Sequence, residues 1–103
     1  MTYGNVLGAL ADPTRRAILE LLRDGPLSVT ALADEMPVSR PAVSQHLGVL
    51  KAANLVREEK DGTRRIYEAS PEGLDELRRY LENTWGEILG QYASSARRKK
   101  RGR

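Results

Sequence analysis

Residues 39–52 are expected to form a helix whose outer face consists of short, neutral, hydrogen-bonding side chains. Val43, Leu47 and Leu50 recur at helical spacing and mark its buried side. The opposite side and its shoulder carry Pro41, Ser44, Gln45, Gly48 and Lys51. Gln pairs bidentately with adenine, Ser hydrogen-bonds several base edges, and small residues allow close approach to a groove. This face favours a helix that reads DNA, although an ordinary surface helix can carry the same pattern.

A shorter helix is expected just before it, over residues 28–36. Ser28 is a suitable N-cap for this helix, and Pro37 ends it because proline cannot continue a helix in good geometry. Ser39 can then accept hydrogen bonds from the free N–H groups of the next helix. Two helices joined by three residues form a helix-turn-helix motif, whose second helix enters the major groove. Any other packed helix pair is the alternative, and the neutral face of the second helix weighs against it.

Two strand-like segments, residues 55–60 and 63–68, flank the dipeptide Asp61-Gly62. This dipeptide favours a two-residue type I′ turn, in which both residues take positive φ. A hairpin directly after a recognition helix is a wing. The basic residues near its tip are Lys60, Arg64 and Arg65. They suit contacts with phosphates or the minor groove, or they form a charged edge that discourages aggregation, because acidic residues are interspersed with them.

Two more helices are expected ahead of the motif. Residues 6–11 form a short apolar helix, and Asp12 followed by Pro13 starts the next one as N-cap and first helical residue. The buried stripe of this second helix consists of Ala17, Ile18, Leu21 and Leu22. Arg15 and Arg16 at its start can contact phosphate, cover the surface or pair with acidic side chains.

Ser70, Pro71 and Glu72 open a final helix of about 22 residues by the same capping logic. Its apolar positions advance in steps of three and four, as in a coiled-coil seam. A small domain cannot bury the whole seam, so we expect a homodimer whose terminal helices pack about a twofold axis. The predicted interface consists of Leu7, Leu10, Leu77, Leu81, Trp85, Ile88, Leu89 and Tyr92. The alternative is a helix that folds back over its own domain.

Residues that could carry catalysis or bind a metal are few. The chain has one histidine and no cysteine, so it lacks the ligands of a strong zinc site and any thiol for redox sensing or disulfides. It has no nucleophile–base pair and no phosphate-cradling glycine loop, so we expect no enzymatic activity, no metal and no cofactor. His46 lies at the border between the two faces of its helix. It is interpreted as a DNA contact, a pH-dependent switch or a half-buried packing residue.

The chain of 103 residues is expected to form one domain, residues 1–96, followed by a basic tail, residues 97–103. The tail holds six of the 17 Lys and Arg residues, so the rest, with 14 acidic residues, has a net charge of about −3. We expect a disordered tail that either attracts phosphates or only keeps the chain soluble. No 18-residue apolar run and no secretory signal are present, so we expect a cytoplasmic protein without a membrane partner.

The segment from residue 9 to 22, ALADPTRRAILELL, resembles the opening of the ArsR/SmtB family of bacterial winged-helix repressors. Residues 39–47, SRPAVSQHL, and 49–56, VLKAANLV, are similar to the family's recognition helix and the start of its wing. The resemblance covers residues 6–69 well and the last helix loosely. It implies a dimer that binds an inverted-repeat operator and blocks transcription, often of its own operon. The DNA-proximal residues it implies are Ser39, Arg40, Pro41, Ser44, Gln45 and His46, with Arg64 and Arg65 in the wing.

The departures from the family pattern concern metal sensing. Metal-sensing members often carry a Cys-x-Cys pair in the helix before the turn, where this chain has Ser28 and Thr30. Others place Asp, His and Glu ligands on the terminal helix, and this chain has no histidine there. The chain therefore resembles the metal-independent, autorepressor-like members.

We therefore predict a mainly α fold with a small β-hairpin: a winged helix-turn-helix of about five helices and a two-stranded wing, with terminal helices at a homodimer interface. The predicted function is sequence-specific repression of transcription on double-stranded DNA. Ser44 and Gln45 would read base edges, while Ser39, Arg40 and Lys51 would position the DNA backbone. The alternatives are a protein-interaction module and a non-specific architectural DNA binder. The operator, the regulated genes and any small-molecule inducer stay open.

Overall fold

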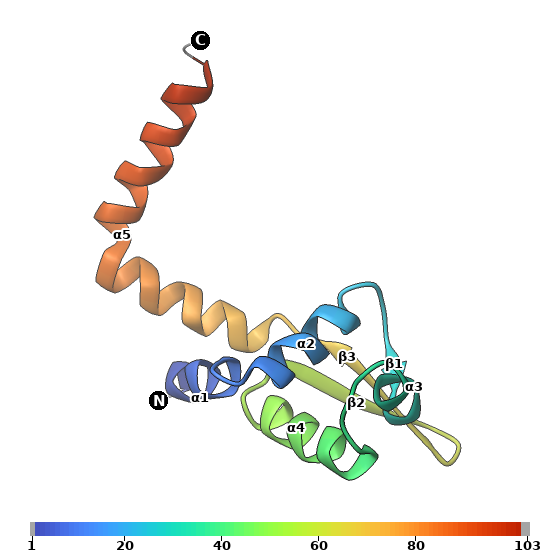
Figure 1. Cartoon of the computed structure of the whole chain (residues 1–103). Helices are drawn as coiled ribbons and strands as arrows, with labels where there is room; N and C mark the ends of the chain where they lie inside the picture. Colours follow the sequence, from blue (N-terminus) through green and yellow to red (C-terminus); the bar gives the residue numbers. More distant parts are fainter. Residues whose placement is uncertain (1, 102–103) are drawn as a thin grey trace.

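The computed structural model describes the backbone of residues 2–101 and the side chains of residues 5–88, 90 and 91. Five helices and three strands follow one another along the chain (Figure 1). They are α1 (Thr2–Leu10), α2 (Pro13–Leu22), β1 (Leu27–Ser28), α3 (Val29–Asp34), α4 (Arg40–Ala52), β2 (Val56–Asp61), β3 (Arg64–Ala69) and α5 (Glu72–Arg101). The predicted winged helix-turn-helix is confirmed: α3 and α4 form the helix-turn-helix, and β2 and β3 form the hairpin behind it. The predicted end of the first helix is wrong, because α3 stops at Asp34, before Pro37, and five residues rather than three join it to α4.

Side-chain caps begin three of the helices where the sequence predicts them. The Asp12 carboxylate accepts from the backbone N–H groups of Thr14 and Arg15, at 2.7 and 3.1 Å, ahead of Pro13. The hydroxyls of Ser28 and Ser39 do the same for α3 and α4, accepting from N–H groups three residues on. Each cap satisfies a donor that has no partner inside its helix. Residues within three positions of each helix start therefore determine where these helices begin.

The end of α4 is closed by a Schellman motif. Asn54 takes a positive φ of 61°, and its N–H donates to the carbonyl of Lys51 at 3.0 Å. The N–H of Leu55 donates to the carbonyl of Leu50 at 2.9 Å. This pair of bonds satisfies carbonyls left free at a helix end, and Asn is one of the few residues besides Gly that adopts the required backbone conformation readily. The motif turns the chain from α4 into β2.

The sheet has three antiparallel strands in the order β1-β3-β2, so the prediction of a two-stranded wing is wrong by one strand. In β1, Leu27 lies opposite Tyr67 and Ser28 opposite Ile66. β1 thus pairs with the edge of β3 that β2 leaves open, where backbone groups would otherwise lack partners. A strand of two residues is too short to show any alternation in the sequence.

The hairpin turn lies one residue later than predicted. Asp61 pairs with Arg64, so the two-residue loop is Gly62-Thr63 rather than Asp61-Gly62. Gly62 has a φ of +67°, and neither Asp61 nor Thr63 has a positive φ. The type I′ turn, which needs positive φ at two successive residues, is therefore absent. A β-branched residue such as Thr63 avoids positive φ, which leaves Gly62 as the only residue of the turn in that conformation.

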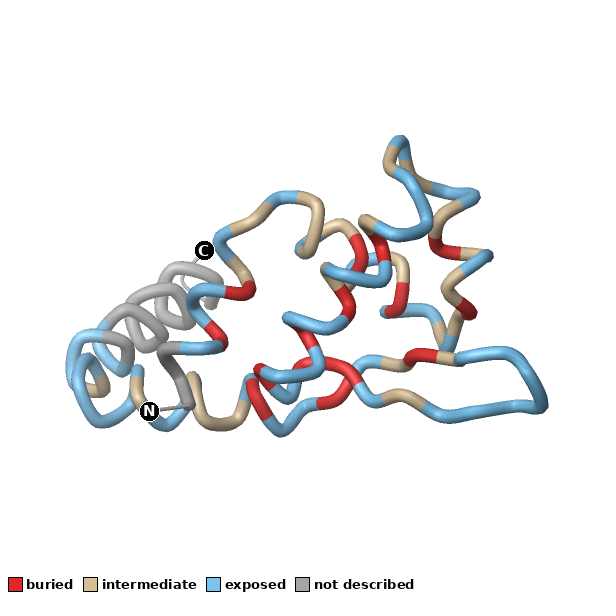
Figure 2. Tube along the Cα trace, turned by 90° about the horizontal axis from the view of Figure 1, so that it is seen from below, coloured by how far each residue is buried: buried red, intermediate tan, exposed pale blue. Residues whose placement is uncertain are grey.

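The core is aliphatic and lies where the helices meet the sheet (Figure 2). Its fully buried side chains include Ile18 and Leu22 from α2, Leu32 from α3, and Val43, Leu47 and Leu50 from α4. Tyr67 of β3 and Val6 of α1 are buried in the same cluster. In Figure 2 the wing leaves this body as an almost wholly exposed loop. The core therefore fixes α4, while the wing depends mainly on its own strand pairing.

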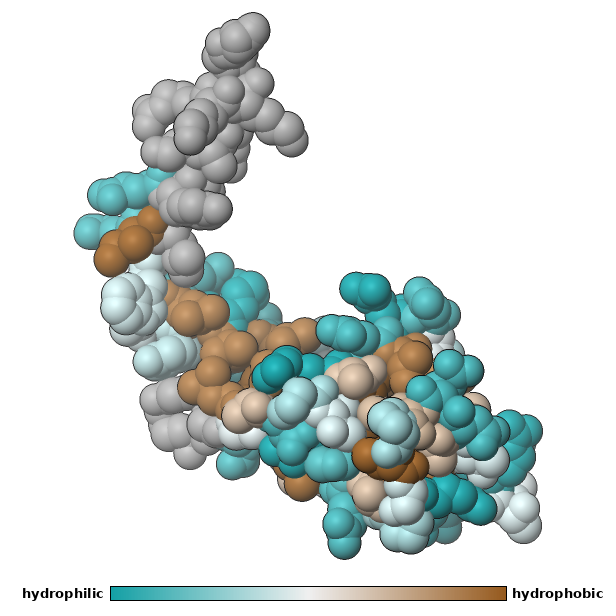
Figure 3. All heavy atoms as spheres, in the orientation of Figure 1, coloured by the Kyte–Doolittle hydropathy of each residue, from teal (hydrophilic) through white to brown (hydrophobic). Residues whose placement is uncertain are grey.

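Helix α5 has 30 residues, longer than the 22 or so predicted, and leaves the body of the molecule after packing against α1 (Figure 1). Its apolar residues form a continuous band with the apolar surface of the body (Figure 3). Leu74, Leu81, Trp85 and Ile88 are exposed in this single chain, and so is Leu7 of α1. Leu77 is partly buried against the core. Within residues 2–101 no helix has the length and apolarity needed to cross a membrane.

Two groups of predicted residues lie outside the described side chains. They are Leu89 and Tyr92 of the predicted interface and the basic residues of the tail, 97–103. The domain boundary at residue 96 and the role of the tail therefore stay predictions.

Gly73 is required where α5 starts against the end of α4. A Cβ at this position would overlap the carbonyl oxygen of Ala53 and come within 3.1 Å of that of Asn54. The Gly73 N–H also donates to the Asn54 carbonyl at 2.9 Å. We expect Gly73→Ala to lower the free energy of unfolding by about 1–3 kcal/mol, measured by urea denaturation at fixed protein concentration.

The matched control is Gly48→Ala, another helical glycine whose Cβ would meet open space. This change should stabilise the protein by about 0.5–1 kcal/mol, because alanine loses less backbone entropy than glycine in a helix. If both variants gained stability alike, the close approach at Gly73 would not constrain the fold.

Candidate nucleic-acid interface

The outer face of α4 is exposed along its whole length. Val43, Leu47 and Leu50 point into the core, which turns Pro41, Ser44 and Gln45 to the surface. Arg40, Gly48, Val49 and Lys51 are exposed beside them. The amphipathic pattern predicted for this helix is confirmed. Apart from Arg40, the exposed residues of its first two turns are short or amide-bearing, and no acidic side chain lies on α4.

A cleft of about 700 Å³ lies between the start of α4, the helix α3 and the tip of the wing. It is lined by Ser28, Val29, Thr30, Ala31, Asp34, Arg40, Ser44, Thr63, Arg64 and Arg65. Four residues predicted to contact DNA, Arg40, Ser44, Arg64 and Arg65, are thus brought together from α4 and the wing. Three arginines against the single carboxylate of Asp34 make the cleft suited to phosphate oxygens.

Ser39 has a structural role as well as its predicted one. Its Oγ accepts from the N–H of Ala42 at 3.2 Å, which caps α4. A hydroxyl that accepts in this way still has its own O–H free to donate. A single side chain can therefore hold the start of the helix and donate to a phosphate.

Lys51 and Arg65, two predicted DNA contacts, share one carboxylate. Lys51 Nζ lies 2.7 Å from Glu58 Oε1, and Arg65 Nε lies 3.3 Å from Glu58 Oε2. The hydrogen bond from Lys51 holds the pKa of Glu58 below its ordinary value, and the same bond raises the pKa of Lys51. Glu58 therefore joins the end of α4 to the wing and offsets part of their positive charge.

Glu58 is a residue that reasoning from the sequence missed. In the sequence it is one of several acidic residues that dilute the charge of the hairpin. Its side chain is only 14% exposed, because it lies on the inner side of the wing between the two cations. Only the packing of β2 against α4 reveals that role.

The basic residues at the wing tip do not share one side of the hairpin. Lys60 lies opposite Arg65, and Asp61 lies opposite Arg64. Because opposed residues point to the same face and the faces alternate along a strand, Lys60 and Arg65 project with Glu58 while Arg64 projects to the other side. The predicted basic cluster thus surrounds the tip of the wing, and all three side chains are exposed.

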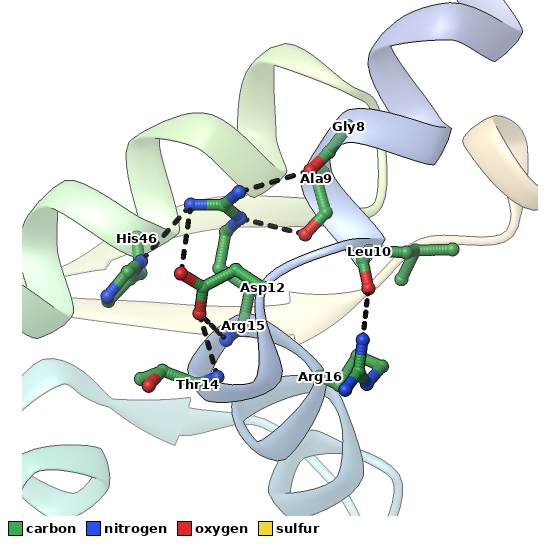
Figure 4. A network of polar contacts seen from close by, with 8 residues as sticks. All are labelled: Gly8, Ala9, Leu10, Asp12, Thr14, Arg15, Arg16 and His46. Carbon is green, nitrogen blue, oxygen red and sulfur yellow. Dashed lines mark hydrogen bonds and ion pairs between the residues drawn. The ribbon is translucent and has the colours of Figure 1, made fainter.

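His46 lies apart from this surface, half-buried and in contact with Arg15 (Figure 4). Arg15 Nη1 is 3.4 Å from His46 Nδ1, and the same guanidinium donates to the carbonyls of Ala9 and Gly8 at 2.8 and 3.1 Å. The packing interpretation of His46 thus has a defined contact, and its predicted contact with DNA stays a prediction. The adjacent Arg16 donates to the carbonyl of Leu10 at 2.8 Å.

Comparisons with known proteins agree with this architecture. A family model described as a helix-turn-helix domain matches residues 10–59. The HTH-type transcriptional regulator Rv2034 of Mycobacterium tuberculosis is 58% identical over 85 residues, which are 82% of this chain and 79% of that protein. The HTH-type transcriptional repressor SmtB of the same species is 45% identical over 64 residues, which are 62% of this chain and 47% of the repressor.

Solved structures extend the similarity to most of the chain. An ArsR-like transcriptional regulator from Rhodococcus sp. RHA1 superposes with a TM-score of 0.76 at 34% identity, covering 93% of this chain and 91% of that one. The match therefore includes the helix-turn-helix, the wing and much of the remaining chain. The chain therefore belongs to the ArsR/SmtB family of helix-turn-helix transcriptional regulators, as its recognition-helix and wing sequences predict.

Proposed function

We propose that this protein is a sequence-specific repressor that binds an inverted-repeat operator as a homodimer, with its own promoter among the targets. The observation that carries the proposal is the neutral, exposed face of α4 beside an arginine-lined cleft. An α-helix with amide and hydroxyl groups outward suits the major groove, while arginines around it suit the flanking phosphates. One of the related proteins is a transcriptional repressor, which supports repression rather than activation of transcription.

The exposed residues of α4 and the wing fall into two groups, those suited to DNA bases and those suited to the DNA backbone. Ser44 and Gln45, one turn into α4, are placed to read base edges. Ser39, Arg40 and Pro41 lie at the start of the helix, where N–H groups and a guanidinium position the DNA backbone. Lys60 and Arg64 of the wing are exposed and suit phosphates or the minor groove. Lys51 and Arg65 contribute less net charge, because both are bound to Glu58.

Dimer formation is supported by the apolar surface that α1 and α5 leave uncovered. Leu7 is 48%, Trp85 47% and Ile88 56% exposed. An apolar groove of about 500 Å³ runs along α5, lined by Leu74, Leu77, Leu81 and the glycines 86 and 90, with Arg78 and Glu82 at its side. Contiguous apolar surface of this kind marks an interface. Glycines let two helices approach closely, so a second copy of α5 is the occupant we propose.

The overall dimensions agree with that proposal. The radius of gyration is 16.9 Å, whereas a compact domain of this length has a value of about 13 Å. The excess arises from α5, which projects beyond the body (Figure 1). A protruding helix with an apolar side is stable in water when another surface covers it.

Independence from metals is proposed from the residues available. Where metal-sensing relatives have a pair of cysteines, Ser28 caps α3 by accepting from the N–H of Ala31 at 3.1 Å, and Thr30 lines the arginine cleft. With one histidine and no cysteine in the chain, a strong zinc site has too few nitrogen and sulfur ligands.

The decisive test is fluorescence anisotropy on the DNA upstream of this protein's own gene, beside a scrambled duplex of equal length, at near-physiological salt. We expect a preference of about a thousandfold or more for the upstream DNA. Equal binding to both duplexes, with a steep dependence on salt, would instead indicate an architectural binder. Binding to neither would favour a protein-interaction module.

Gln45→Ala should weaken binding to the operator by about 1–3 kcal/mol and leave binding to random DNA nearly unchanged, because only the operator presents the base edges that the amide pairs with. Gln91→Ala is the matched control, an exposed glutamine on α5 rather than α4. It should alter neither affinity. An equal loss on both duplexes for Gln45→Ala would show that this residue does not read bases.

Trp85 reports directly on the proposed interface, because it is the only tryptophan in the chain. Covering a half-exposed indole by a second α5 should shift its fluorescence to shorter wavelength as protein concentration rises. Ile88→Glu should abolish this shift and produce a monomer in sedimentation velocity, since a buried unpaired carboxylate is costly. Val49→Glu, on the exposed face of α4, is the control and should stay dimeric. A monomeric wild-type protein at micromolar concentration would contradict the proposal.

A further inference from the structure

One arginine joins three helices at a single point. The Arg15 guanidinium, at the start of α2, donates from Nε and Nη2 to the carbonyls of Ala9 and Gly8 at the end of α1, at 2.8 and 3.1 Å. Its third contact, from Nη1, reaches Nδ1 of His46 in the middle of α4 at 3.4 Å. The side chain is largely shielded from solvent, with 17% of its surface exposed. The position of α4 relative to α1 therefore depends in part on this group (Figure 4).

The contact with His46 requires one protonation state. Arginine carries only donors and stays charged, so it can donate to Nδ1 only when that nitrogen is unprotonated. The imidazole must then be neutral, with its hydrogen on Nε2. A protonated imidazole has donors at both nitrogens and would set two cations against each other at the same distance.

The neighbouring acid cannot fully compensate for that repulsion. Asp12 Oδ2 is 4.0 Å from Arg15 Nη1, while Oδ1 accepts from the backbone N–H groups of Arg15 and Thr14. The backbone hydrogen bond from the Arg15 N–H is the main reason that the pKa of Asp12 is lowered, with smaller contributions from the Thr14 N–H and the charge of Arg15. Within the described residues, Arg15 contacts His46 directly and Asp12 interacts with it electrostatically. Neither α3 nor β2, which also pack against α4, gives His46 a hydrogen bond or ion pair within the described part of the chain.

We propose that Arg15 and neutral His46 form a positioning pair that holds α4 against α1 in the orientation that binds operator DNA. Protonation of His46 breaks the pair, so operator affinity falls on acidification. The inference rests on the proposed function and adds a control to it. Because α1 also packs against α5, the pair connects the recognition helix to the proposed dimer elements.

The opposite behaviour would follow from a direct contact between His46 and DNA. A protonated imidazole on a phosphate would strengthen binding as the pH falls, because it adds a positive charge to the interface. The sign of the pH dependence therefore separates the two roles. His46 is the only histidine in the chain, so few other groups titrate in this range.

The experiment measures operator affinity at constant salt between pH 8 and pH 6. We expect the wild type to lose about tenfold in affinity over this range. His46→Asn places an amide oxygen where Nδ1 stood and does not titrate, so its operator affinity should be the same at pH 8 and at pH 6. Arg15→Lys removes the fork of donors, so it should bind more weakly at pH 8 and lose the pH dependence. Arg16→Lys is the matched control and should behave like the wild type.

A second readout does not depend on DNA. The ¹⁵N spectrum of the single imidazole should show an unprotonated Nδ1 and a protonated Nε2 at pH 8. A proton on Nδ1, an affinity that rises or stays constant on acidification, or an unchanged pH dependence in His46→Asn would each overturn the inference. Absence of any operator preference at pH 8 would instead overturn the proposed function, and the imidazole spectrum would still decide whether the contact with Arg15 exists.

Discussion

The burial of one side of α4 is the constraint on which the rest of the structure depends. Val43, Leu47 and Leu50 have no exposed surface, and they lie where α1, α2, α3 and β2 all contact this helix. Burying each such side chain contributes about 1.5–3 kcal/mol, so rotating the helix would cost several of these contributions at once. The same burial turns Ser44 and Gln45 outward. The surface offered to DNA is thus a direct consequence of the core.

Polar contacts then fix what the apolar core leaves adjustable. Ser39 caps the start of α4, Asn54 closes its end, and Arg15 bonds to its middle through His46. These contacts are directional, whereas apolar packing alone tolerates small shifts along the helix axis. The wing is held in the same manner, since Glu58 connects it to Lys51. The geometry of the candidate interface is therefore set by a few charged and hydroxyl groups around a mainly aliphatic core.

Among the described side chains, the positive charge available for binding DNA comes from a few unpaired arginines at one place, and not from a net positive charge of the whole domain. The chain carries a formal charge of +3, yet six of its basic residues lie in residues 97–103. In the described part, Arg57, Lys51, Arg65, Arg78 and Arg79 all have acidic partners. Arg40 and Arg64 have no acidic partner within the described residues and line the same cleft. A short-range pattern of this kind favours specific placement on DNA over general attraction to phosphate.

The sequence by itself determined the local features. Capping residues and helical periodicity located the starts of α2, α3 and α4 and the buried face of α4, because these signals act between residues at most four apart. Glycine also marked the hairpin, although the turn lies at Gly62-Thr63, one residue later than the predicted Asp61-Gly62. Only the tertiary structure decided the pairing of β1 with β3, the sharing of Glu58 between Lys51 and Arg65, and the contact of Arg15 with His46. Each joins residues distant in the chain, where no periodicity or motif records the partner, and each depends on how whole elements pack together.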